Sequence, residues 1–211
     1  MVYETIGREA RLMALGVILV WAACNRPDAG SEPMEENEDE VASTAKPVHR
    51  GDEARGESSH TIATLEGKSG SALSGEAMFM EVDGGDVSFT LRVQNAPAGE
   101  HAVHIHENGD CSAPDASSAG AHWNPMSDNH GKRGEDSFHA GDIGNLEVGA
   151  DGVGSLTMTV SDWSLEESGV ESVLGKALVV HSGADDFRTQ PDGAAGERIG
   201  CGVIGRTNAN P

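Results

Sequence analysis

Short runs of alternating polarity, separated by Gly, Asp and Asn, constrain the fold of this chain most. The run from Asp86 to Val93 places Val, Phe, Leu and Val at every second position, the period of a strand with one buried face. Asp83-Gly84-Gly85 before it is a turn signal. The 28 glycines argue against long helices, because a glycine inside a helix costs about 1 kcal/mol relative to alanine.

The same pattern continues from about Thr61. Further strand candidates are 76–82, 102–106, 152–160, 176–181 and 201–204. They predict an all-β protein, an antiparallel Greek-key β-sandwich or flattened barrel of about eight strands. Residues 107–145 and 182–200 do not read as strands. Loops of this length in a compact domain are usually functional or disordered, and we expect these two to be functional.

Residues 1–23 are similar to an export signal. The apolar run from Leu12 to Ala23 follows Arg8 and Arg11 and is too short for a membrane span of about 20 residues. Cys24 comes next, as in a bacterial lipoprotein signal, where the cysteine is lipidated and becomes the mature N-terminus. The alternative is cleavage nearby by an ordinary signal peptidase, with Cys24 discarded or free. Either route predicts the periplasm or cell envelope, with membrane contact only through a lipid at Cys24.

Acidic residues dominate between Glu32 and Glu57, where large apolar residues are few. Residues 24–58 are therefore expected to form a disordered tether, and 59–211 the folded domain. The net charge of −21 argues against nucleic acid and anionic membrane surfaces as partners, because both are negative themselves.

The cysteines agree with export. If Cys24 is lipidated, Cys111 and Cys201 remain as an even pair in an oxidising compartment, where disulfides form. A bond between them would close a loop of roughly 90 residues and add at most about 4–5 kcal/mol in chain-entropy models. The alternative is two buried free thiols.

Histidines carry the strongest chemical signal. His104 and His106 lie two apart on a strand candidate, so both imidazoles can reach one ion. Alone, such a pair is weak evidence. The later candidates are His122, His130, His139, Asp142 and His181. Three histidines with one aspartate are typical of a closed zinc site, and imidazole also suits copper.

Around these residues the chain resembles the copper-zinc superoxide dismutase family, over roughly residues 60–206. The matching stretches are His104-Ile105-His106-Glu107-Asn108-Gly109-Asp110-Cys111, Ala121-His122-Trp123-Asn124-Pro125, His139-Ala140-Gly141-Asp142-Ile143-Gly144-Asn145, Val179-Val180-His181 with Asp185-Asp186, and Gly196-Glu197-Arg198-Ile199-Gly200-Cys201-Gly202-Val203-Ile204. The resemblance is specific because these motifs occur in order and with the family's ligand spacing. The insertion 112–121 looks like the bacterial branch.

The resemblance implies one copper and one zinc ion per subunit. The implied copper ligands are His104, His106, His122 and His181. The implied zinc ligands are His122, His130, His139 and Asp142. His122 would then bridge both metals as an imidazolate, which two flanking cations make feasible. Asp185 would hydrogen-bond ligand histidines of both metals.

The resemblance also implies a Cys111–Cys201 disulfide and dismutation of superoxide to oxygen and hydrogen peroxide, an extracytoplasmic antioxidant activity. Arg198 would attract and orient the anionic substrate, and His122 would share in catalysis. The family includes dimers and monomers, so a homodimer is compatible with the sequence. His101 is expected to be a structural hydrogen-bonding residue, and His49 and His60 solvated tether residues.

Two other function classes stay open. A copper carrier on the same sandwich would bind metal without dismutase activity, but such domains usually lack a copper ligand or the arginine. A purely structural sandwich would leave the histidines without a role. The charge of −21 opposes an anionic substrate. Much of the acid lies in the tether, however, beyond a Debye length of about 8 Å from copper if the tether is extended.

Overall fold

The computed structural model describes residues 60–207, and every structural statement below refers to them. The strands are β1 His60–Gly67, β2 Ser74–Glu81, β3 Val87–Gln94, β4 Gly99–His106, β5 Asp142–Val148, β6 Gly154–Val160, β7 Ala177–His181, β8 Arg198–Val203 and β9 Gly205–Thr207. Within this range the only helical element is a 3-10 turn, η1 Ser117–Ala119. The expected signal, Cys24 and the tether lie outside the described residues. No helix in the described range has the length and apolar character to span a bilayer.

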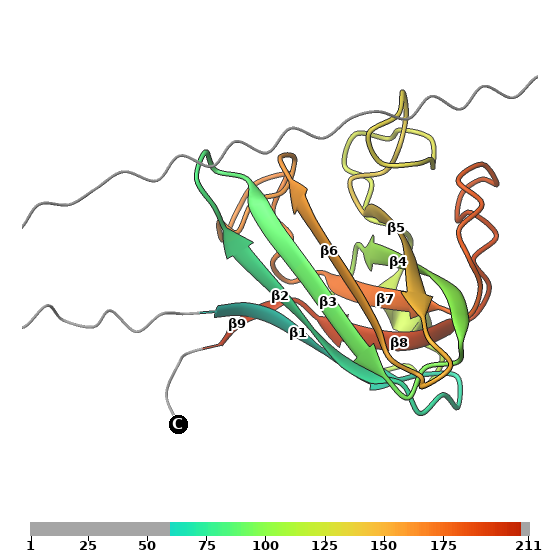
Figure 1. The fold of residues 1–211 in the computed structure, drawn as a ribbon. Helices are drawn as coiled ribbons and strands as arrows, with labels where there is room; N and C mark the ends of the chain where they lie inside the picture. The colour runs from blue at the N-terminus through green and yellow to red at the C-terminus, as the bar shows by residue number, and fades with distance from the viewer. Residues whose placement is uncertain (1–59, 208–211) are drawn as a thin grey trace, which may run out of the picture. The chain divides into compact units, whose positions relative to one another are not determined.

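The strands close into an antiparallel barrel (Figure 1). Neighbours follow the order β1-β2-β3-β6-β5-β4-β7-β8, β8 returns to β1, and β9 pairs antiparallel with the start of β1. The jumps from β3 to β4 and from β6 to β7 give the Greek-key pattern. The two seams are short, because β5 and β6 share one residue pair and β1 and β8 share two. The barrel is therefore flattened into two facing sheets, which confirms the predicted fold class.

Inward-facing residues fill the space between the sheets. Val87, Phe89, Leu91 and Val93 of β3 are buried in the core, as their alternation predicts. Trp163 closes one end, with its ring centroid 5.8 Å from that of Phe89 in an edge-on contact. This core uses only the inner face of each strand.

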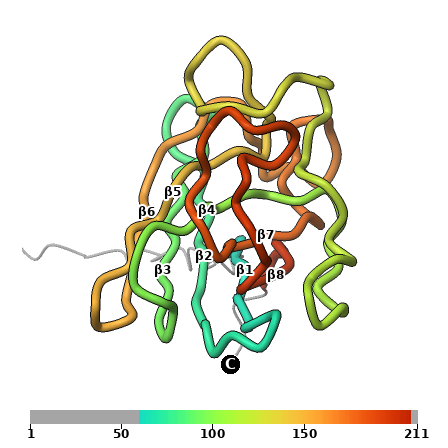
Figure 2. The backbone as a smooth tube through the Cα atoms, turned by 90° about the vertical axis from the view of Figure 1, so that its right-hand side faces the viewer, coloured from blue at the N-terminus to red at the C-terminus, as the bar shows by residue number. Residues whose placement is uncertain are grey.

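β4 is buried on both faces from His101 to His106. Val103 and Ile105 belong to the core, so strand alternation turns His104 and His106 to the outer face. The register shifts between Val103 and His104 of β4 and between Val180 and His181 of β7, with the extra residue of each bulge on the partner strand, in β5 and β8. Bulges redirect side chains and are frequent beside functional sites. In Figure 2 the yellow part of segment 107–141 lies next to the red segment 182–197, and the backbone N–H of His130 donates to Gln190 between them.

Some predicted boundaries are wrong. β5, Asp142–Val148, was not among the predicted strands, and its first four residues were expected to be loop. Gly144 and Asn145 are both poor strand formers, which explains the omission. β8 likewise begins at Arg198 rather than Cys201. His60 is the first residue of β1 and pairs with Thr207, so it is not a tether residue. The three-residue β9 was not predicted from the sequence.

Candidate metal centre

Six histidines and one aspartate converge in two buried groups that share His122. The first group is His104, His106, His122 and His181; the second is His122, His130, His139 and Asp142. In each group, one ligand atom from every residue lies within 4.8 Å of the others. The structure thus brings together the residues that the sequence predicted for each site. Which ions they bind stays a prediction.

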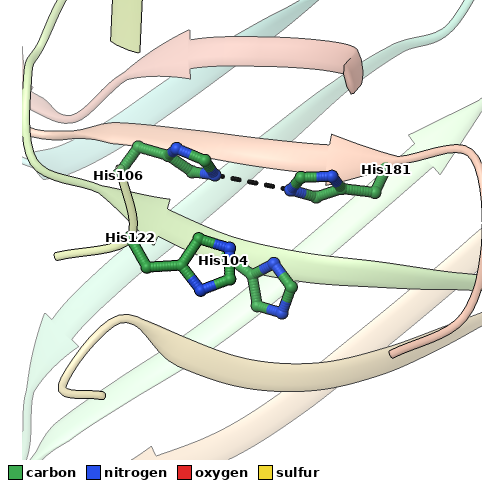
Figure 3. Close-up of side chains that lie close together, drawn as sticks. All are labelled: His104, His106, His122 and His181. Carbon is green, nitrogen blue, oxygen red and sulfur yellow. Dashed lines mark hydrogen bonds between the residues drawn. The ribbon is translucent and has the colours of Figure 1, made fainter. Parts of the chain in front are cut away.

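The first group lies on the outside of the barrel wall. β4 supplies His104 and His106, and the end of β7 supplies His181. His122 comes from the first loop, where it forms an isolated β-bridge with His106. In Figure 3 the four imidazoles surround one space, with Nε2 of His106 and Nε2 of His181 only 3.4 Å apart.

The ring nitrogens that point away from this space donate to oxygen acceptors. The pairs are His104 Nε2 to Asp185 Oδ2 at 2.9 Å, His106 Nδ1 to the Gly120 carbonyl at 3.0 Å, and His181 Nδ1 to the Gly196 carbonyl at 3.3 Å. Carboxylate and carbonyl oxygens only accept, so each outer nitrogen carries the proton. The inner nitrogens keep their lone pairs, as metal ligands require.

Three inner atoms are buried and have no hydrogen-bond partner, namely His104 Nδ1, His122 Nε2 and His130 Nδ1. The last lies 2.9 Å from Asp142 Oδ2, in a geometry that makes no hydrogen bond. Buried polar atoms are nearly always bonded in proteins. Three exceptions in one place, all on imidazoles beside an aspartate, fit a pair of cations. The donor sets suit copper in the first group and zinc in the second.

Burial keeps three histidines of the first group neutral. It lowers the pKa of His106 to about 2, of His181 to about 3 and of His122 to about 4. Neutral imidazoles can bind a metal without first losing a proton. His130 differs: burial opposes its charged form, but the carboxylates of Asp142 and Asp185 outweigh burial and raise its pKa to about 9.

Asp142 is the acidic ligand of the second group. Burial alone would raise its pKa, but the neighbouring His122, His130 and His139 hold the pKa well below its usual range. Oδ2 also accepts the backbone N–H of His139 at 2.8 Å and that of Gly131 at 3.2 Å. Asp142 is therefore ionised and fixed in place.

Asp185 connects the two groups. Its Oδ2 accepts from His104 and its Oδ1 from His130, at 2.9 and 2.8 Å. Burial opposes the charged carboxylate, but these bonds keep its pKa below the usual range. Its backbone is held by the Asn145 side chain, which donates to the Asp185 carbonyl at 3.0 Å and accepts its N–H at 2.7 Å. Gly193 covers the pair, where a Cβ would overlap the Asp185 carboxylate.

An open cavity of about 720 Å³ leads to the first group and is lined by His106, His122, His181 and Arg198, among others. The guanidinium of Arg198 donates to the carbonyls of Ala116 and Gly120, both at 2.7 Å. The Gly120 carbonyl also accepts from His106, so one peptide group fixes both the arginine and a histidine of the first group. A larger groove of about 890 Å³ crosses the outer faces of β1, β2 and β3, and its lining contains no histidine.

Cys111 and Cys201 form a disulfide. It ties the loop that contains Ala116 and Gly120 to β8, and the free-thiol alternative is not seen. His101 is buried, with Nδ1 and Nε2 each 2.8 Å from a backbone carbonyl, of His181 and Pro97. This matches the structural role expected for it.

Sequence reasoning missed three supports of the site. They are Gln190, Asn145 and Arg133, the last donating to the Asp142 carbonyl at 2.7 Å and to the Ala140 carbonyl. Asn145 belongs to the matching stretch His139–Asn145, but no role could be assigned to it from the sequence. For Gln190 and Arg133 the sequence offers no signal, because contacts between long loops follow no periodic pattern.

Residues 73–204 match the family model for copper/zinc superoxide dismutase. The chain belongs to this family. The match covers the whole histidine constellation, the disulfide and Arg198. It extends from before β2 to the end of β8.

Named relatives agree with this assignment. Superoxide dismutase-like protein YojM of Bacillus subtilis (strain 168) is 41% identical over 111 residues, which are 51% of this chain and 57% of that protein. The match thus spans less than two thirds of that relative. A double mutant of a SOD-like protein from Bacillus subtilis has a TM-score of 0.62 at 36% identity, covering 68% of this chain and 96% of that one. The clock protein EA4 gives 0.62 at 33%, covering 69% and 93%.

Proposed function

We propose that this protein is a copper-zinc superoxide dismutase of the periplasm or cell envelope. The observation that carries the proposal is the pair of complete ligand groups joined by His122, with Arg198 in the cavity that opens on the first group. The overall reaction takes two superoxide ions and two protons to oxygen and hydrogen peroxide.

Copper would bind His104, His106, His122 and His181, and zinc would bind His122, His130, His139 and Asp142. Bound copper would supply one-electron redox chemistry, while zinc, which has none, would fix His122 and its loop. Nε2 of His122 belongs to the first group, and His122 lines the cavity. This nitrogen is therefore suited to hold the proton that the product needs.

Arg198 would bind and orient the anionic substrate. Two carbonyls fix its guanidinium, so little side-chain entropy is lost when an anion binds. Among the described residues that line the cavity it is the only lysine or arginine, against the carboxylates of Glu107, Asp128 and Asp192. Attraction of superoxide therefore depends on Arg198 and the bound cations rather than on the net charge.

The relatives named as superoxide dismutase-like leave metal carriage as the second candidate. The complete first group together with Arg198 favours catalysis. Export, lipid attachment at Cys24 and a homodimer remain proposals from the sequence. Mass spectrometry of the mature N-terminus and sedimentation of the purified protein test them.

The deciding experiment combines metal analysis with superoxide decay after pulse radiolysis, on the full exported chain. We expect one copper and one zinc per chain and a second-order rate far above spontaneous decay. His106→Gln should lose copper and activity, and His139→Gln should mainly lose zinc. Two bound metals without faster decay would reject the dismutase and favour the carrier.

A further inference from the structure

Gln190, in the loop between β7 and β8, connects the two long loops through its side chain. Its Oε1 accepts the backbone N–H of His130 at 2.8 Å, and its Nε2 donates to the carbonyl of His130 at 2.8 Å. The carboxamide thus pairs with the main chain of His130 at both polar groups, much as a neighbouring strand would. The two residues are 60 positions apart in the sequence.

Among the described residues, Gln190 alone hydrogen-bonds the backbone N–H and carbonyl of His130. Its ring is held through Nε2 by Asp185, and Nδ1 lies near Asp142. A ring can be aimed only as well as its Cα is placed. The Gln190 carboxamide binds both the N–H and the carbonyl of His130. It therefore fixes the backbone position from which the His130 ring is oriented.

The same side chain belongs to the wall of the substrate cavity. Gln190, Pro191 and Asp192 all line that cavity. The preceding turn is rigid, because Asp186 accepts the backbone N–H groups of Arg188 and Thr189 at 2.9 and 2.8 Å. Movement of His130 would therefore be transmitted to this wall through Gln190.

We propose that Gln190 is a positioning residue that sets the place of His130 in the zinc group and couples zinc binding to the order of the cavity wall at 186–193. The inference rests on the proposed function only in taking the second group as a zinc site. In the described part of the chain, the Gln190 side chain hydrogen-bonds His130 and Arg188, and neither belongs to the first group. Its loss should therefore affect zinc and leave copper binding intact.

The first test is metal-free. Amide hydrogen exchange of His130 is measured in the apo form of the full chain, in wild type and in Gln190→Ala. Losing a hydrogen bond of ordinary strength should speed this exchange roughly fivefold to tenfold. Gln94→Ala is the matched control, because Gln94 is an exposed glutamine at the end of β3. It should leave the exchange of His130 unchanged.

The second test measures zinc affinity by competition with a chromophoric chelator. Gln190→Ala should bind zinc about tenfold more weakly, with an unchanged copper absorption spectrum and copper affinity. Gln190→Glu keeps an acceptor for the His130 N–H but loses the donor, so its affinity should be intermediate. In wild type, zinc should slow amide exchange across 186–193, and this effect should shrink in Gln190→Ala.

Unchanged His130 exchange, or unchanged zinc affinity, in Gln190→Ala overturns the proposal. Equal loss of copper and zinc does so as well, because it would indicate general destabilisation. These readouts need no dismutase activity. A protein that dismutates superoxide while Gln190→Ala behaves as wild type refutes only the role of Gln190, whereas a chain that binds no zinc refutes both proposals.

Discussion

His122 faces a different group with each ring nitrogen. Nδ1 lies 3.0 Å from Asp142 Oδ1 in the second group, and Nε2 is one of the unpartnered atoms in the first. A substitution of His122 that keeps a ligand atom at only one of these two positions would leave the two groups without a shared residue. This is why the residue is central to the proposed chemistry although it comes from a loop.

At the same scale, Arg198→Ala should lower the second-order rate with superoxide about tenfold or more, because a steering charge is lost at the cavity. Both metals should remain, since Arg198 touches ligands only through Gly120. Pulse radiolysis at low salt measures the rate. Arg198→Lys keeps the charge and should recover part of it. Equal rates for wild type and Arg198→Ala would remove the substrate role from this residue.

Gly193→Ala should disturb the histidine–carboxylate bridge. Gly193 has φ +66°, and a Cβ there would overlap the Asp185 carboxylate and approach His130 Nε2. We expect a stability loss above about 1 kcal/mol, together with weaker zinc retention during dialysis. Gly70→Ala is the control, with φ +77° and open space around the added carbon. Gly70→Ala should lose stability because of its backbone conformation but should retain zinc. Identical zinc loss in both variants would contradict the proposed overlap at Asp185.

At the scale of elements, the strands that could be predicted are those whose sequences alternate between apolar and polar residues. β3 could be found because one face meets the core and the other meets solvent, which writes an alternation into the sequence. β5 could not, because Asn145 supports Asp185 and Gly144 has φ +126°, and neither residue type is typical of a strand. The ligand groups could be proposed from motifs, whereas Gln190 depends on how two loops fold onto each other.

The disulfide joins an irregular loop to β8. The double variant Cys111→Ser/Cys201→Ser should unfold with a free energy lower by about 2–5 kcal/mol, since 90 residues separate the cysteines. It should also lose activity below its melting temperature, because the released loop carries both acceptors of Arg198. Denaturant unfolding and the radiolysis rate report the two effects. Cys24→Ser replaces the one cysteine outside this disulfide and should unfold like wild type.

At the scale of the whole molecule, the metals should stabilise a barrel that can form without them. The core lies between the sheets and contains no ligand. Zinc at a thousandfold excess over its Kd would add about 4 kcal/mol, or roughly 8–16 °C in Tm for a chain of this size. Calorimetry with and without a chelator measures the shift, and circular dichroism should still report β structure after metal removal. An unchanged Tm would mean that the buried groups bind no metal.

The two-faced burial of β4 has a consequence for insertions and deletions. From Val103 to His106, core side chains and histidines of the first group alternate, so hydrophobic packing and the proposed metal site are encoded in the same four residues. Sliding this strand by one position would send Val103 and Ile105 outward and turn His104 and His106 into the apolar interior. We therefore expect insertions and deletions in the loops, whereas β4 must keep its length.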